Sequence, residues 1–195
     1  MNGGIIKLQR FTFGMIKPDI TNRNAKEFSK AMTVLDTMLQ DQNLLILRAE
    51  VGPDGRGITP GKAFFMRFYE EHCRKFFYPR LLIHITSGPV IPMIIASNPS
   101  ITSSSEDSSN NNPVAKWRDL MGPTHIQTSR VQNPHSFRGR FAQSDTLNAL
   151  HGSDTVENAI KETGLFWNFP SIVQNDIVQT FIPTMSSTGI KLAKD

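Results

Sequence analysis

A short apolar segment near the start of the chain constrains the fold more than any other feature. Residues 10–19 read Arg-Phe-Thr-Phe-Gly-Met-Ile-Lys-Pro-Asp, and the part up to Ile16 has the aromatic and apolar character of a buried strand. Pro18 then stops the strand, because proline has no backbone N–H to donate to a sheet. The segment therefore predicts a buried strand that ends at Lys17.

A second segment, residues 148–154, holds a histidine between small polar residues and the predicted start of a helix. Asp154 and Glu157 are spaced like an N-cap and its reciprocal acid, and apolar residues recur at helical spacing over 156–163. We therefore expect His151 to lie beside a helix N-terminus. Such an end offers unpaired amide donors, which favour a phosphate group and a neutral, nucleophilic imidazole.

Together the two segments resemble the nucleoside diphosphate kinase family. In that family an Ile-Lys-Pro-Asp strand end supplies a phosphate-binding lysine, and an Asn-x-x-His-Gly-Ser-Asp segment supplies a histidine that is transiently phosphorylated. The resemblance covers about residues 10–166, and the family's other motifs follow in the same order. These motifs are the helical lid at 68–81, the Ser-Gly-Pro-Val turn at 87–90, and the segments 117–124 and 136–141.

The resemblance implies transfer of a γ-phosphoryl group between nucleotides by a ping-pong mechanism. His151 would be the nucleophile, assisted by Lys17, with Ser153 and Glu162 orienting the imidazole. The implied nucleotide-binding residues are Lys17, Tyr69, Phe76, Leu81, Arg118, Thr124, Arg138 and Asn148. Among these, Asn148 with Lys17 would bind the sugar hydroxyls and Phe76 would stack on the base, so all common nucleoside di- and triphosphates (ATP, GTP, CTP, UTP and their deoxy forms) are expected ligands. Mg²⁺ would bind through the nucleotide's own phosphates, without a dedicated side-chain cluster.

Several segments depart from the commonest form of the family. Residues 121–124 read Met-Gly-Pro-Thr where Leu-Gly-Glu-Thr is usual, and the stretch from Thr124 to Arg138 is longer. These changes resemble the divergent branch typified by the family's sixth, mitochondrial-type member. We expect these departures to affect catalytic strength and oligomeric state more than nucleotide binding. A homo-oligomer stays open. The alternative reading is a weakly active or inactive nucleotide-binding member that acts as an interaction or regulatory protein.

The pattern of apolar residues predicts one α/β domain of the α+β kind. We expect a ferredoxin-like antiparallel sheet covered by helices on one face, as in the family. The domain would span residues 10–166, with a Ser/Asn-rich flexible insertion at 97–113 and a C-terminal extension at 167–195. The individual elements expected are helices over 28–39, 60–71 with Thr59 as N-cap, and 114–121, strands over 44–47 and 90–96, a short strand before His151, and an irregular loop from 122 to 138.

Composition narrows the possible partners. The net charge of +4 favours anionic ligands, but the basic residues are not interleaved with aromatics, which argues against a nucleic-acid partner. No apolar run reaches the roughly 18 residues that a membrane helix needs, so no membrane partner is expected. The first eight residues lack the arginine-rich character of a transit peptide, and the compartment, cytoplasmic or mitochondrial, stays open.

Other candidate motifs fail on inspection. The segment 57–62 hints at a phosphate-binding P-loop, but Arg56 stands where its first glycine should be and Ala63 replaces the magnesium-binding hydroxyl. His72 and Cys73 have no second ligand pair at metal spacing, which argues against a zinc site. The remaining histidines at 84, 125 and 135 are expected to be surface or core residues.

Overall fold

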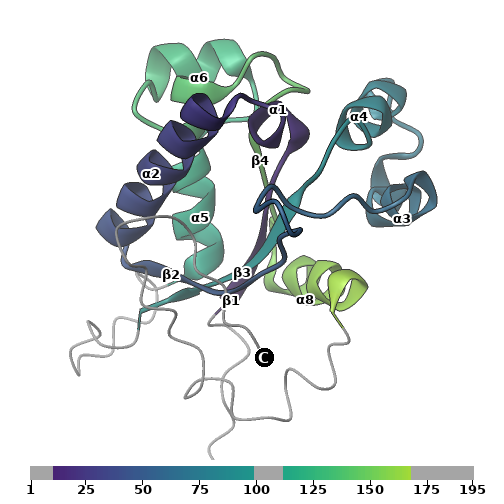
Figure 1. Ribbon diagram of the computed structural model, residues 1–195, viewed down its shortest axis with the longest axis horizontal. Helices are drawn as coiled ribbons and strands as arrows, with labels where there is room; N and C mark the ends of the chain where they lie inside the picture. Colours follow the sequence, from purple (N-terminus) through teal and green to yellow (C-terminus); the bar gives the residue numbers. More distant parts are fainter. Residues whose placement is uncertain (1–10, 99–111, 168–195) are drawn as a thin grey trace, which may run out of the picture.

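The computed structural model describes residues 11–98 and 112–167 of the chain. Its elements follow the expected alternation of strands and helices (Figure 1). In chain order they are β1 (Phe11–Ile16), α1 (Pro18–Thr21), α2 (Ala25–Asp41), β2 (Leu44–Ala49), α3 (Lys62–Phe68), the 3₁₀ turn η2 (Glu70–His72), α4 (Tyr78–Ile85), β3 (Ile91–Ser97), α5 (Pro113–Met121), α6 (Ile126–Gln132), α7 (Phe137–Phe141), β4 (Leu150–Gly152) and α8 (Val156–Phe166). Most of the predicted insertion at 97–113 and of the predicted extension at 167–195 lies outside the described residues.

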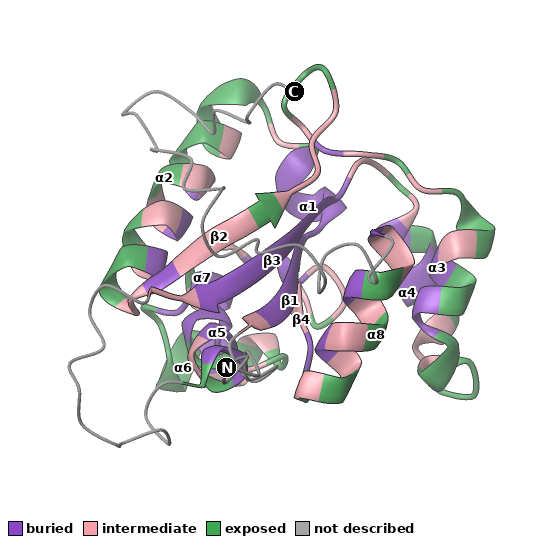
Figure 2. Cartoon of the chain, turned by 90° about the horizontal axis from the view of Figure 1, so that it is seen from below, coloured by how far each residue is buried: buried purple, intermediate pink, exposed green. Residues whose placement is uncertain are grey.

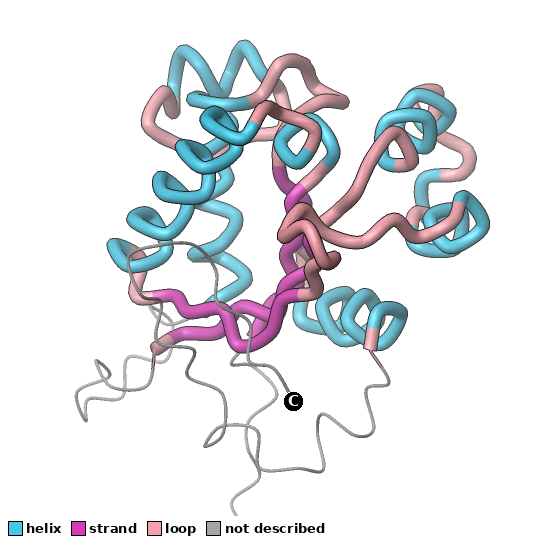
Figure 3. The backbone as a smooth tube through the Cα atoms, viewed as in Figure 1, coloured by secondary structure: helices cyan, strands magenta, loops and turns pink. Residues whose placement is uncertain are grey.

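The four strands, magenta in Figure 3, form one antiparallel sheet. Their order is β2-β3-β1-β4, which confirms the expected fold class. Strand β1 lies inside the sheet and pairs with both β3 and β4. In the β1–β4 pairing, Ile16 lies opposite Leu150 and Met15 lies opposite His151. The end of the Lys17 strand and the histidine segment are therefore neighbours across the sheet.

Helices cover both faces of the sheet, so the expectation of helices on one face is wrong. Alternate residues of β1 enter two separate apolar clusters, Ile16 on one face and Phe13 and Met15 on the other. The first cluster packs under α2, α5 and α7, and the second packs under α3, α4 and α8. Figure 1 shows α2 and α5 on one side of the sheet and α8 on the other, and Figure 2 shows the buried strands between them. Because successive side chains of a strand point to opposite faces, β1 contributes apolar residues to both clusters.

Helix α2 illustrates how well a periodic segment can be predicted. Its buried residues Ala31, Leu35 and Leu39 recur every four positions, and the Asn24 side chain accepts a hydrogen bond of 3.0 Å from the Glu27 amide at its start. The helix predicted over 28–39 is therefore confirmed, with three further residues at its start and two at its end. None of the helices in the described part of the chain has the length and apolar character that crossing a membrane requires.

The predicted irregular loop between 122 and 138 is wrong, because helix α6 lies within it and helix α7 begins at Phe137. Helix α6 has no apolar face that the sequence pattern could reveal, and its Val131 is 74% exposed. Its first amide, on Ile126, donates instead to Asp145 Oδ1 at 2.8 Å, a partner 19 residues away. A tertiary contact therefore stabilises this helix where its own sequence does not.

Two predicted helix starts are also shifted. Helix α3 begins at Lys62 after Gly61, rather than at Pro60 after Thr59, and ends before η2. Helix α8 is capped by Thr155, whose hydroxyl accepts from the Asn158 amide at 3.1 Å, so Asp154 is not its N-cap. Asp and Thr are both favourable N-cap residues. Thr155 has the extended backbone of an N-cap, so it fills this position in place of Asp154.

Candidate active site

His151 lies in β4, with its ring fixed by a carboxylate from α8. Its Nε2 lies 3.0 Å from Glu162 Oε2, and Ser153 Oγ donates to the same oxygen at 2.5 Å. A carboxylate can only accept, so Nε2 carries the proton and Nδ1 keeps its lone pair. We expected the ring to lie beside the N-terminus of this helix, but it lies against the second half of α8. The contact with Glu162, rather than the helix end, determines the tautomer.

Three aromatic rings surround the imidazole. The rings of Phe13, Phe68 and Tyr69 have their centroids 5.9, 5.1 and 5.8 Å from that of His151, each meeting it edge to face. Burial, followed by the charge of Glu162, raises the pKa of the Tyr69 hydroxyl, so Tyr69 stays neutral. The imidazole therefore sits in an apolar frame that limits its rotation and excludes water from one side.

Two glycines let helix α5 approach the histidine strand closely. Gly14 and Gly152 face each other across β1 and β4, and a Cβ atom on Gly152 would lie 2.5 Å from the Trp117 ring. Trp117 occupies this space, is fully buried, and donates from Nε1 to the His151 carbonyl at 3.3 Å. Arg118, the next residue, is carried on the same helix beside the histidine strand.

Lys17 is buried at the end of β1 and bound to the opposite segment. Its Nζ donates to Asn148 Oδ1 at 2.7 Å and to the Thr146 carbonyl at 2.8 Å. Burial lowers the pKa of Lys17 to about 8, with Asp19 opposing this shift and Arg138 adding to it. The structure therefore brings together two of the predicted nucleotide-binding residues, Lys17 and Asn148.

Arg138 is the most extensively bonded side chain in the site. Its guanidinium donates to the carbonyls of Gly122 (2.8 Å), Asn148 (3.2 Å) and Leu150 (2.8 Å), and to Thr124 Oγ1 at 3.3 Å. Burial, followed by repulsion from Arg118, lowers the pKa of Arg138 to about 10. Arg118 and Arg138 line the same pocket, so they bring positive charge to a common region, as a phosphate site requires.

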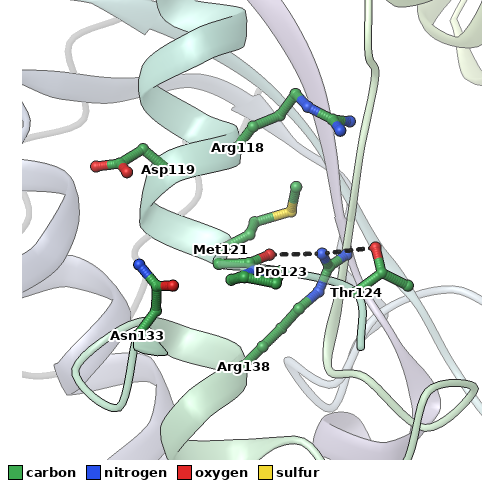
Figure 4. Close-up of a pocket in the computed structure, with 8 residues that line it drawn as sticks. Arg118, Asp119, Met121, Pro123, Thr124, Asn133 and Arg138 are labelled. Carbon is green, nitrogen blue, oxygen red and sulfur yellow. Dashed lines mark hydrogen bonds between the residues drawn. The ribbon is translucent and has the colours of Figure 1, made fainter. Parts of the chain in front are cut away.

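A pocket of about 270 Å³ lies between α5 and α7. Predicted phosphate-binding residues Arg118, Thr124 and Arg138 line it, together with Asp119, Met121, Gly122, Pro123 and Asn133. Figure 4 shows the Arg118 guanidinium, Arg138 and Thr124 toward one side, and Asp119 and Asn133 toward the other. The pocket therefore has a cationic side suited to phosphate oxygens.

The predicted lid residues Tyr69, Phe76 and Leu81 differ in their contacts and in their exposure. Tyr69, with His151 and Glu162, lines a second small cavity of about 30 Å³ between α8 and η2, whereas the Leu81 side chain is packed in the core beneath α4. Phe76 is 87% exposed, with the Arg80 guanidinium 5.7 Å from its ring centre. The neighbouring ring of Phe77 contacts His72 instead, and His72 stacks on Tyr69.

The sequence reasoning missed one pair near the site. His84, expected to be an ordinary surface or core residue, is buried and its Nε2 lies 3.1 Å from Asp19 Oδ1. The other oxygen of Asp19 accepts the Ala149 amide at 2.8 Å, two residues before the histidine. Asp19 belongs to the Lys-Pro-Asp motif, which was the available signal, but its partner is visible only in three dimensions.

Comparison with known proteins gives concordant results. A family model described as nucleoside diphosphate kinase matches residues 10–172. Nucleoside diphosphate kinase 6 of Xenopus tropicalis is 38% identical over 168 residues, which cover 86% of this chain and 79% of that protein. Nucleoside diphosphate kinase 6 of Danio rerio is 30% identical over 164 residues, which cover 83% and 78%. A crystal structure of the Aquifex aeolicus nucleoside diphosphate kinase is similar in fold, with a TM-score of 0.62 at 24% identity over 81% of this chain and 94% of that one.

Proposed function

The chain belongs to the nucleoside diphosphate kinase family, in its divergent branch related to the sixth member, and from this premise we propose that it is an active phosphotransferase. His151 Nδ1 attacks the γ-phosphorus of a nucleoside triphosphate. The N–P bond forms as the bond from that phosphorus to the β–γ bridging oxygen breaks, and the nucleoside diphosphate leaves with that oxygen. A second nucleoside diphosphate then takes the phosphoryl group by the reverse step, which regenerates the free histidine.

The observation that carries this proposal is the arrangement of His151 and Glu162. The 3.0 Å contact from Nε2 to the carboxylate holds the proton on that nitrogen, so Nδ1 is the nucleophilic one. Glu162 also stabilises the positive charge that develops on the ring when Nδ1 becomes bonded to phosphorus. Ser153 acts indirectly, by holding the Glu162 oxygen that the ring contacts.

Phosphate binding is assigned to Lys17, Arg118, Thr124 and Arg138. Arg118 is exposed at the pocket and Arg138 lines its wall, so both can reach phosphate oxygens from the cationic side. Among residues 11–98 and 112–167, no three His, Cys, Asp or Glu side chains converge as a metal cluster would require. We propose that Mg²⁺ is carried to this site by the nucleotide phosphates, where it would neutralise part of their charge.

The base and sugar contacts follow from the same geometry. Asn148, with Lys17, is proposed to bind the sugar hydroxyls. We propose Phe76, whose ring is 87% exposed, as the base-stacking residue, with Phe77 packed behind it between the Phe76 and His72 rings. An aromatic face cannot count donors and acceptors on a base edge, so selectivity among bases should be shallow, within about two orders of magnitude.

A labelling experiment tests the reaction. The protein is incubated with ATP labelled at the γ-position, and the labelled protein is then exposed to acid and to base. We expect a label that acid removes and base leaves, that His151→Ala abolishes, and that an added nucleoside diphosphate discharges. His135→Ala, a change at an exposed histidine, is the matched control. Undiminished labelling of His151→Ala would contradict the assignment.

A second candidate function is nucleotide binding with weak transfer, in a protein that acts mainly on partners. It is favoured by one observation, that the Lys17 and Arg138 donors already bind protein oxygens and must leave or share them to hold phosphate. Comparing nucleotide affinity by calorimetry with the rate of label discharge separates the two. Tight binding with negligible discharge would favour the second function.

A further inference from the structure

The Asp19 carboxylate joins three parts of the chain at one buried point. Its side chain has no exposed surface. One oxygen accepts from His84 on α4 at 3.1 Å, and the other accepts the Ala149 amide, just before β4, at 2.8 Å. These partners are 65 and 130 residues from Asp19 in sequence, so the contact exists only in the assembled domain.

The Ala149 backbone that Asp19 contacts is strained. Its φ is +69°, and the Leu150 amide donates to the Asn148 carbonyl at 2.8 Å, which together define a γ-turn of the rare, left-handed kind. A residue with a Cβ adopts such a φ only where its surroundings hold it there. The holding contacts are the Asp19 carboxylate on the Ala149 N–H and the Lys17 amide on its C=O, at 2.9 Å. Asn148 is the first residue of this turn, and His151 directly follows its last residue, Leu150.

His84 determines which way the Asp19 carboxylate faces. Lys17 and Arg138 are charged donors in the same buried region, since Lys17 is two residues from Asp19 and Arg138 donates to the carbonyls of Asn148 and Leu150, on either side of Ala149. With one oxygen bound to His84, the other is directed at Ala149. Without His84, a buried oxygen loses its partner, and rotation toward either cation would release the turn.

We propose that His84 is a positioning residue for phosphoryl transfer, which it serves by holding Asp19 on the Ala149 turn and so keeping Asn148 and His151 in register. The proposal rests on the proposed function for its kinetic consequence. Through Asp19, this role of His84 also connects helix α4, which follows the lid residue Phe76, to the segment before β4 that leads to His151.

Three variants test the proposal. His84→Leu removes the donor, His84→Gln retains a donor at similar reach, and Ile85→Val loosens the packing of the same helix without touching Asp19. We expect His84→Leu to lower kcat by at least about tenfold relative to Ile85→Val, the rate equivalent of one hydrogen bond to a charged group, and His84→Gln to recover most of it. In parallel, NMR should show the Ala149 amide exchanging with solvent at least about tenfold faster in His84→Leu, with the strand amides of β3 unchanged.

The outcomes separate this proposal from the proposed function. If His84→Leu retains the kcat of Ile85→Val, or if His84→Gln is as impaired as His84→Leu, a positioning role is overturned. Unchanged Ala149 exchange in a folded His84→Leu overturns it as well. If the unmodified protein forms no phosphohistidine, the proposed function fails, and the Ala149 exchange, which needs no activity, alone decides the role of His84.

Discussion

Lys17 Nζ lies 2.7 Å from Asn148 Oδ1, although 131 positions separate the two residues in the sequence. The contact joins the end of β1 to the segment before β4, and it leaves a buried ammonium beside the proposed nucleotide site. Its protonation state therefore controls how strongly this part of the site attracts phosphate.

The first prediction is a loss of nucleotide affinity in mild alkali. Because burial lowers the pKa of Lys17 to about 8, the ammonium loses its proton as the pH rises through that value. An uncharged amine attracts phosphate less, so KM for the nucleotide should rise by up to about tenfold for each pH unit above 8. Steady-state kinetics between about pH 7 and pH 10 measure this. Lys17→Arg, which stays charged throughout, is the control, and a flat KM in the unmodified protein would contradict the prediction.

The second prediction concerns the partner of the histidine ring. Glu162→Gln removes the negative charge that Nε2 contacts, so phosphorylation of His151 should slow about tenfold to 150-fold, corresponding to a loss of about 1.5–3 kcal/mol. Single-turnover labelling with γ-labelled ATP gives the rate. Glu157→Gln, an exposed change on the same helix, should leave it within about twofold. Equal rates in the two variants would show that Glu162 does not orient the ring.

Much of the fold could be predicted from the sequence, for a definite physical reason. Segments that bury one face repeat their apolar residues, as Ala31, Leu35 and Leu39 do, and the repeat is visible before folding. Helix α6 has no such repeat and depends on Asp145, so it could not be found. The second layer of helices was missed because the sequence shows that strand residues alternate, but not what covers each face.

The site divides in the same way. His151, Lys17 and Glu162 could be proposed because they lie in, or at fixed spacing from, short linear motifs whose chemistry is specific. The structure places His151 beside Glu162 and Lys17 beside Asn148. Base stacking by Phe76 stays a prediction, since adjacent aromatics give the same sequence pattern and only side-chain direction, exposed for Phe76 and toward His72 for Phe77, separates them. His84 has no motif of its own.

The third prediction distinguishes the two arginines of the phosphate pocket. Arg138→Lys cannot replace a fork that serves four acceptors, so buried carbonyls lose partners and the free energy of unfolding should fall by at least about 2 kcal/mol. Arg118→Lys, at an exposed side chain, should change it by less than about 0.5 kcal/mol. Urea unfolding of both variants measures the difference. Both should still weaken nucleotide binding, and equal stabilities would argue against a structural role for Arg138.

The fourth prediction concerns the close approach of α5 to the histidine strand. Gly152→Ala places a Cβ about 2.5 Å from the Trp117 ring, so the helix or the strand must move, and stability should fall by about 1–3 kcal/mol. The movement also shifts Arg118 relative to His151, and the rate of transfer should fall in parallel. Gly61→Ala, where a Cβ meets nothing within 4 Å, is the matched control. Thermal unfolding and single-turnover kinetics measure both effects. If Gly152→Ala matched Gly61→Ala in stability and rate, the prediction would be wrong.

The contacts of Asp19 with His84 and Ala149 also constrain the order in which the domain folds and becomes active. This junction joins α1 near the start of the domain to α4 in the middle and to the turn before β4, across separations of 65 and 130 residues, so it forms only when long loops close. A partly folded chain can therefore have most of its helices and still lack a competent histidine. During refolding, recovery of phosphoryl transfer should lag behind recovery of helical circular dichroism, and species populated before the junction closes should be catalytically silent.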